Sequence, residues 1–194
     1  MITVACVLKA GGVYTDGHVA RLHGQVVDYL KIPFWFVCLS DVKVPCDRIR
    51  LMHGWPGYWS KLELFTPKLF SGRVLYLDLD VTIRDDLAPF IDYPYPFAII
   101  KDWTRRGYNS SVIVWDAGYA DRLYAQFSPT RMEEFAGDQD WINETMPGAA
   151  TFPLGWACSF KASGNRIPAY AKVIVYHGRP KPPGFLDAAR PSSR

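Results

Sequence analysis

The chain has few cysteines, and no two of them stand at metal-binding or redox spacing. Four cysteines are scattered over 194 residues without a Cys-x-x-Cys pair, so neither a zinc knuckle nor a redox motif is indicated. Cys6 and Cys38 lie inside strand-like runs and are expected to be reduced core thiols. Because free thiols are usual in a reducing compartment, the default localisation is the cytoplasm.

The sequence also lacks blocks of like charge and long apolar runs. Its net charge of +3 comes without a block of five or more basic residues, so we expect no nucleic-acid partner. No apolar stretch reaches the length that a membrane span needs. The opening residues, MITVACVLK, have no basic region and only a short apolar run, so no signal peptide is expected.

Apolar and aromatic residues are plentiful. The chain is 49% hydrophobic and 15% aromatic, a composition typical of a folded domain and not of a disordered chain. Its length suits one domain with a sizeable core. We expect a single domain over residues 1–185 and a flexible C-terminal tail over residues 186–194, LDAARPSSR.

Hydrophobic periodicity predicts an α/β fold class, with a mostly parallel central sheet flanked by helices. Residues 2–8 and 34–39 are typical of buried strands, and the helix between them is expected to be capped by Asp16. A strand, a helix and a strand in this order form a right-handed βαβ unit. A capping box at residues 60–63 predicts a helix that Pro67 limits. Further strands are expected at residues 74–77, 97–100, 112–115 and 173–176, and further helices at about 117–127 and from residue 138.

Two aspartates directly follow the strand expected at residues 74–77. In the segment RVLYLDLDVTI, Asp78 and Asp80 are separated only by Leu79. Side chains alternate across a strand, so both carboxylates begin on one face, at the carboxyl end where α/β sheets bind ligands. Two close carboxylates repel each other unless a cation lies between them. The spacing suggests a divalent metal shared with a phosphorylated ligand; the alternative is one aspartate that caps a turn and one that is solvated.

Four segments then follow in a set order. They are SKLELFTPKLFSGRVLYLDLDVTI, YNSSVIVWD, GDQDWIN and YHGRPKP, and together they span Lys61 to Lys181. In this order they resemble the lysine-bearing helix with Asp-x-Asp, the Asn-Ser-Gly segment, the Asp-Gln helix start and the terminal His-Gly-Lys-Pro signature of nucleotide-sugar glycosyltransferases. The resemblance is to the GT-A fold, especially to glycosyltransferase family 8, the group that includes glycogenin. It implies a single GT-A, Rossmann-like domain.

The resemblance implies a metal site and a diphosphate site. Asp78 and Asp80 would bind manganese(II), with magnesium(II) as the alternative, and His177 would be a third protein ligand. A nitrogen ligand beside carboxylates favours manganese. Lys181 would contact the donor diphosphate, and Lys61 would lie near it. The alternatives are a histidine that simply ends a strand and a solvated lysine in the first turn of a helix.

The resemblance also implies which residues meet the base and the sugar. Asp102 and Asn109 would hydrogen-bond sugar hydroxyls, although Asp102 is equally placed to close a turn. Asp138 and Gln139 would be catalytic, as nucleophile, electrostatic stabiliser or sugar clamp, and Asp138 has a rival role as an N-cap. Tyr14 would stack on the nucleotide base.

The chain departs from the family pattern in places. Ser111 stands where the family has glycine, the terminal signature is two residues shorter, and Pro183 replaces a tryptophan. The chain is also short for the family, which implies an acceptor region that is reduced or supplied by a partner. Residues 55–59, WPGYW, are either an aromatic platform for a sugar acceptor or a buried helix entry.

The implied reaction moves a sugar from a nucleotide-diphosphate sugar, with UDP as the expected nucleotide, to a hydroxyl of a glycan, protein or small-molecule acceptor, with retention of configuration. Two alternatives stay open. Asp78-Leu79-Asp80-Val81-Thr82 also fits the first motif of haloacid-dehalogenase-type phosphatases, but that motif normally lies on the first strand, whereas two strands precede it here. The other alternative is a non-catalytic nucleotide-sugar-binding module. The oligomeric state is left open, a homo-oligomer included.

Overall fold

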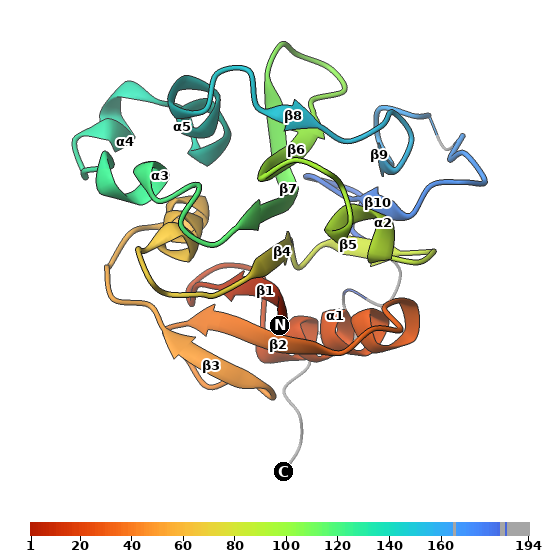
Figure 1. The fold of residues 1–194 in the computed structure, drawn as a ribbon, viewed down its shortest axis with the longest axis horizontal. Coiled ribbons are helices and arrows are strands. Elements are labelled where there is room, and N and C mark those ends of the chain that lie inside the picture. Colours follow the sequence, from red (N-terminus) through yellow and green to blue (C-terminus); the bar gives the residue numbers. More distant parts are fainter. Residues whose placement is uncertain (165, 183–184, 186–194) are drawn as a thin grey trace.

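A seven-stranded sheet forms the centre of the fold (Figure 1). The computed structural model describes residues 1–164, 166–182 and 185. Four of the six strand pairings are parallel, and the other two are antiparallel. The expected mostly parallel sheet is therefore confirmed. In spatial order its strands are β3 (Asp47–Arg50), β2 (Phe34–Ser40), β1 (Ile2–Leu8), β4 (Arg73–Leu77), β7 (Tyr108–Asp116), β6 (Phe97–Lys101) and β8 (Ala150–Thr151).

A second sheet of three strands begins just after the aspartate pair. In it, β10 (Val173–Val175) lies between β5 (Val81–Ile83) and β9 (Ala157–Ser159). The strand β10 is antiparallel to β5 and parallel to β9. The backbone N–H of Tyr176 donates to the carbonyl oxygen of Asp80 at 3.3 Å. The end of β10 therefore lies along the turn that carries Asp80.

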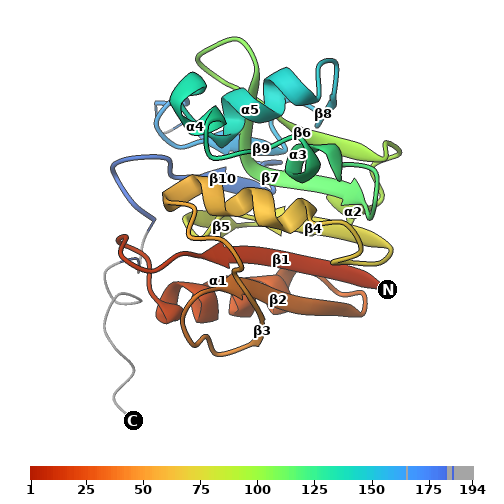
Figure 2. The same cartoon turned by 90° about the vertical axis from the view of Figure 1, so that its left-hand side faces the viewer.

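Helices cover both faces of the central sheet. The helix α1 (Asp16–Tyr29) lies on one face. The opposite face is covered by the 3-10 helix η1 (Gly57–Phe65), α3 (Arg122–Ala125) and α5 (Asp138–Thr145), which lie on the near side in Figure 2. The remaining helices, α2 (Ala88–Ile91) and α4 (Arg131–Glu134), are single turns within connections.

The strand β4 is buried on both faces, and this sets the direction of Asp78. Leu75 and Leu77 pack in the core on the α1 side, whereas Val74 and Tyr76 pack in the core on the η1 side. A strand buried on both faces has an unbroken apolar sequence. Because side chains alternate, Asp78 continues the face of Val74 and Tyr76. It therefore leaves the core on the side of η1.

The helix expected from Ser60 is a 3-10 helix that begins earlier, at Gly57. The hydroxyl of Ser60 donates to the carbonyl oxygen of Gly57 at 2.7 Å. The carboxylate of Glu63 accepts the backbone N–H groups of Met52 (2.6 Å) and His53 (3.1 Å). The capping-box prediction is wrong, because both of its side chains have other partners.

Two other helix predictions also need correction. The N-cap of α1 is Thr15 and not the next residue, since the backbone N–H of Thr15 donates to Nδ1 of His18 at 2.9 Å. The helix expected over residues 117–127 is reduced to α3. Gly118 has a φ of +89°, which a right-handed helix cannot include.

Two expectations concern the ends and the surroundings of the domain. The predicted tail at residues 186–194 lies outside the described residues, so it stays a prediction. Within the described ranges, none of the helices combines the length and the apolar character needed to cross a bilayer.

Candidate functional site

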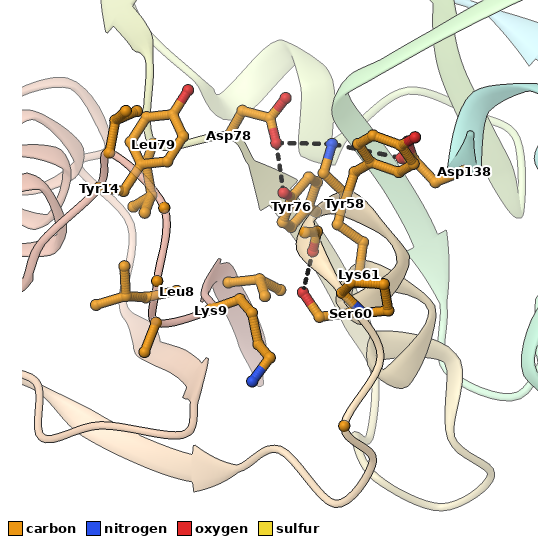
Figure 3. A pocket seen from close by; sticks show the side chains of 18 of the residues that line it. Leu8, Lys9, Tyr14, Tyr58, Ser60, Lys61, Tyr76, Asp78, Leu79 and Asp138 are labelled. Atoms are coloured by element: carbon orange, nitrogen blue, oxygen red, sulfur yellow. Dashed lines mark hydrogen bonds and ion pairs between the residues drawn. The ribbon is translucent and has the colours of Figure 1, made fainter. Parts of the chain in front are cut away.

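A pocket of about 710 Å³ opens at the carboxyl ends of β1 and β4 (Figure 3). Its walls come from the loop after β1, from the start of η1, from the turn after β4 and from the start of α5. Its volume is in the range of small-molecule sites, roughly 300–1,000 Å³. Five of the residues expected to bind the donor or to be catalytic line it, namely Tyr14, Lys61, Asp78, Asp138 and Gln139.

A buried ammonium group holds two carboxylates together at the floor of this pocket. The Nζ atom of Lys61 lies 2.9 Å from Oδ1 of Asp78 and 3.4 Å from Oδ2 of Asp138. It also donates to the hydroxyl of Ser110 at 3.1 Å. That hydroxyl donates to Oδ2 of Asp138 at 2.6 Å, and the phenol of Tyr76 donates to Oδ1 of Asp78 at 2.5 Å. Every charged group of this network has a partner, as buried charges require.

The charges in this network set the protonation of its members. Burial alone would lower the pKa of Lys61, but Asp138 and then Asp78 more than offset it, so its pKa is raised above the usual value. Burial, followed by the charge of Asp78, raises the pKa of Tyr76 well above its usual value. Lys61 therefore stays an ammonium and Tyr76 a phenol at neutral pH. Both can then donate to groups in the pocket.

The second aspartate belongs to a separate cluster. The Nζ atom of Lys181 lies 2.7 Å from Oδ2 of Asp80, and the hydroxyl of Tyr14 donates to the same oxygen at 2.7 Å. Lys181 also donates to the hydroxyl oxygen of Tyr14 at 2.9 Å. Burial and then the charge of Asp80 raise the pKa of Tyr14, so Tyr14 stays protonated. Base stacking by Tyr14 stays a prediction, but its hydroxyl is engaged by the second aspartate of the Asp-x-Asp segment.

The three expected metal ligands are not brought together. Among the described residues, no three His, Cys, Asp or Glu side chains are grouped so that they could hold a metal ion. The Nε2 atom of His177 lies 2.6 Å from the hydroxyl of Ser159, and its ring stacks on Trp103. Tyr176 is the residue paired with Asp80, and neighbouring side chains of an extended segment point to opposite sides. His177 is therefore engaged away from the two aspartates in this structure, and its role as a third ligand stays a prediction.

The two aspartates without His177 still suit a divalent cation in their chemistry. Both supply carboxylate oxygens, the ligands that hard cations prefer. In this structure Asp78 is neutralised by Lys61 and Asp80 by Lys181. A cation at the pair would be held by these two carboxylates together with ligand oxygens.

Two residues expected at the donor sugar make local contacts instead. Oδ1 of Asp102 accepts the backbone N–H groups of Thr104 (2.8 Å) and Arg105 (2.9 Å), so Asp102 closes a turn, as the alternative had it. Oδ1 of Asn109 accepts the backbone N–H of Ser111 at 3.0 Å within β7. In the described chain, neither Asp102 nor Asn109 is among the residues that line the pocket. Their sugar contacts stay predictions.

The start of α5 differs from the N-cap alternative. Gly137 is the N-cap, and Asp138 is the first helical residue with its carboxylate turned to Lys61. Oε1 of Gln139 accepts Nη2 of Arg105 at 3.2 Å. The N-cap role of Asp138 is therefore wrong, and both residues of the expected catalytic pair reach the pocket.

The aromatic segment at residues 55–59 is partly buried and partly exposed, and its role as an acceptor platform stays a prediction. Trp55 and Trp59 are buried, which is the helix-entry role. Tyr58 is 49% exposed and lines the pocket, and its hydroxyl donates to the carbonyl oxygen of Ala136 at 2.8 Å. Tyr58 alone is therefore available as a platform.

Sequence reasoning missed four residues that shape this site. Ser110 and Tyr76 bind the two pocket carboxylates, and Arg105 holds Gln139. Arg21 donates through Nη2 to the carbonyl oxygens of Leu79 (2.9 Å) and Val81 (2.8 Å). Ser110 and Tyr76 both stand in quoted segments and offered a signal there, whereas Arg105 and Arg21 offered none.

The contacts of Arg21 predict a role in holding the aspartate turn. Changing Arg21→Met keeps the aliphatic stem and leaves the carbonyl oxygens of Leu79 and Val81 without this donor. We expect the free energy of unfolding in urea to fall by about 2 kcal/mol, the typical cost of a buried group left unpaired. Arg48→Met on exposed β3 is the matched control. Equal losses in the two variants would contradict this role.

Comparison with known proteins places the fold. The sequence matches no protein-family model and no curated protein. Solved structures do match. The galactosyltransferase LgtC, solved with donor and acceptor sugar analogs, superposes with a TM-score of 0.65 at 15% identity, over 96% of this chain and 95% of that chain. The glycosyltransferase GlyE of Streptococcus pneumoniae TIGR4 gives a TM-score of 0.71 at 11% identity, over 97% and 61%.

A third similar structure matches this chain over nearly the whole length of both chains. A glycosyltransferase involved in glycosylation of the major capsid of PBCV-1 gives a TM-score of 0.62 at 12% identity, over 97% of each chain. Identities this low show the fold and leave membership of family 8 a prediction. The chain has the GT-A fold of these glycosyltransferases, as its four ordered segments predicted.

Proposed function

We propose that the protein is a glycosyltransferase that moves a sugar from a nucleotide-diphosphate sugar, with UDP as the nucleotide, to an acceptor hydroxyl with retention of configuration. The observation that carries this proposal is the pocket at the carboxyl ends of β1 and β4, where Lys61 lies between Asp78 and Asp138. Ligands of open α/β sheets bind at this edge. The GT-A fold supports the proposal that this pocket is the donor site.

The charged groups of the site suit a departing diphosphate. Breaking the anomeric bond leaves negative charge on that group, and preorganised cations stabilise such charge as it develops. Lys61 lines the pocket, and Lys181 lies beside Asp80 at the same turn. Both ammonium groups are proposed to contact phosphate oxygens. A divalent cation, manganese(II) or magnesium(II), held by Asp78 and Asp80 would add Lewis-acid stabilisation.

The start of α5 is proposed to face the transferred sugar. Oδ2 of Asp138 is held by the hydroxyl of Ser110 and by the ammonium of Lys61 in a buried position. Because both contacts occupy this oxygen, we propose electrostatic stabilisation rather than attack on the sugar as the role of Asp138. Gln139 lines the pocket and is held by Arg105. Its amide is therefore the group proposed to contact sugar hydroxyls.

The test begins with binding. A panel of nucleotide-diphosphate sugars is screened by thermal unfolding, with and without manganese or magnesium chloride. A true donor at one hundred times its Kd stabilises the protein by about 2.7 kcal/mol, which raises Tm by roughly 5 °C. The best donor is then assayed for slow hydrolysis, and the anomer of the sugar product is read by NMR.

The outcomes separate the alternatives. Donor binding that never leads to hydrolysis or transfer would support the non-catalytic module, and an inverted product would remove the retaining mechanism. Magnesium-dependent hydrolysis of p-nitrophenyl phosphate, lost in Asp78→Asn, would support a phosphatase. The position of Asp78 after the fourth strand of the chain already disfavours that reading.

A further inference from the structure

A second hollow lies beside the candidate site. It has a volume of about 360 Å³, and we call it the outer pocket. Its walls include Lys101 at the end of β6, Trp103 in the following loop and Ser159 at the end of β9. Leu154, Arg166 and Tyr170 complete the opening. No proposed donor-binding or catalytic residue lines it.

The outer pocket opens at the same edge of the sheet as the donor pocket. The strand β6 is antiparallel to β7, which is antiparallel to β4, so β4 and β6 run in the same direction. The carboxyl ends of both strands therefore meet one edge. The loop after β6 joins the two pockets, because Trp103 lines the outer one and Arg105 holds Gln139 of the donor pocket.

Two aromatic side chains of the outer pocket are held in place. The indole N–H of Trp103 donates to the carbonyl oxygen of Ala157 at 3.2 Å, and the face of its ring stacks on His177. The ring of Tyr170 lies directly on Gly155, where an added Cβ would be 2.3 Å from a ring carbon. Tyr170 is 63% exposed even so. Large exposed rings that are fixed from behind form a ready apolar surface for a ligand.

The charged side chains that line the outer pocket are all positive. Lys101 and Arg166 line it, and no aspartate or glutamate of the described residues does. Among the described residues, neither cation has an ion-pair partner, in contrast to Lys61 and Lys181 in the donor site. Free cations beside an apolar wall are complementary to a ligand that carries both an anionic and an apolar part.

We propose that the outer pocket binds the acceptor and that the acceptor is a sugar with an anionic substituent next to an apolar or aromatic group. This inference rests on the proposed transferase function. The acceptor would lie against Trp103 and Tyr170, with its anionic group beside Lys101 and Arg166, and its hydroxyl would reach the donor past Gln139.

The test uses pairs of probes that differ in charge. Binding of p-nitrophenyl β-glucuronide and of p-nitrophenyl β-glucoside to the full chain is measured by ligand-observed NMR without donor; glucose 6-phosphate against glucose tests a phosphate. The glucuronide or the phosphate is expected to bind roughly fivefold more tightly than its neutral partner, as two exposed charge pairs allow. The double variant Lys101→Gln with Arg166→Gln is expected to lose this preference. Lys31→Gln, an exposed lysine that bonds only Val27 within α1, is expected to keep it.

Two results would overturn the inference: equal binding of charged and neutral probes to the unchanged protein, or a preference that survives in the double variant. Because these measurements need no donor, they fail or succeed independently of the donor screen. A chain that binds nucleotide-sugars but shows no charge preference would keep the proposed function and lose the anionic acceptor. Thermal unfolding of the double variant checks that it is folded.

Discussion

Changing Asp80→Ala is expected to lower sugar transfer about a thousandfold while the protein stays folded. Charge stabilisation at the leaving diphosphate is worth several kcal/mol, and each ~1.4 kcal/mol is tenfold in rate. Asp80 is the carboxylate that holds Lys181 and Tyr14, so its loss also frees two groups proposed to face the donor. Lys181 keeps the hydroxyl of Tyr14 as a partner, so the free energy of unfolding falls by only about 1 kcal/mol.

Asp85→Ala is the matched control for this prediction. Asp85 also pairs with a lysine, Lys172, at 3.1 Å, and it lies only five residues further along the chain. It lines none of the pockets described above. Turnover in this variant is expected to match the unchanged protein, measured at saturating donor with manganese. A rate in Asp80→Ala within tenfold of the control would remove Asp80 from the site.

The long buried strands and the place of the site were predictable because they depend on local apolar runs, whereas the short strands β3, β5, β8 and β9 were not predicted. The run before Asp78 predicted β4, and α/β sheets bind ligands at the carboxyl ends of their strands. The pocket does open there, and it includes Asp78. The order of the four quoted segments predicted the GT-A fold, because it fixes which strand ends meet at that edge.

The partners of the site side chains were not predictable in the same way, because they come from distant parts of the chain. Arg21 reaches a carbonyl oxygen 58 residues away. The capping box failed because Glu63 is captured by the backbone of a loop that precedes η1. The direction of His177 depends on the register of β10 against β5, and a shift of one residue would reverse it.

Lys61 shows most clearly how distant contacts decide the role of a side chain. From the sequence alone, it was either a phosphate contact or a solvated lysine in the first turn of a helix. The structure removes the solvated alternative, because its ammonium lies buried against Asp78 and Asp138. The position of Ser60 and Lys61 inside η1, and not at its start, turns the lysine into the pocket. Because this ammonium is buried, we expect the removal of Lys61 to have a large effect on the free energy of unfolding.

Changing Lys61→Met is expected to lower the free energy of unfolding at pH 7 by about 3–5 kcal/mol, because it leaves the half-buried Asp78 and the buried Asp138 without their cation. Urea unfolding measures this loss, and adding Asp138→Asn should recover part of it, since one buried charge is then removed. Lys9→Met breaks a more exposed pair with Asp41 at the same pocket and should cost less than about 1 kcal/mol.

The pKa of Lys61 is raised on folding, so the stabilisation that Lys61 contributes is fully present below its unfolded pKa of about 10.4. That stabilisation is lost only as the pH rises through the higher folded pKa. The gap between the two proteins should therefore be constant from about pH 7 to 9. A loss no greater than that of Lys9→Met, or no recovery in the double variant, would show that the two carboxylates do not depend on this lysine.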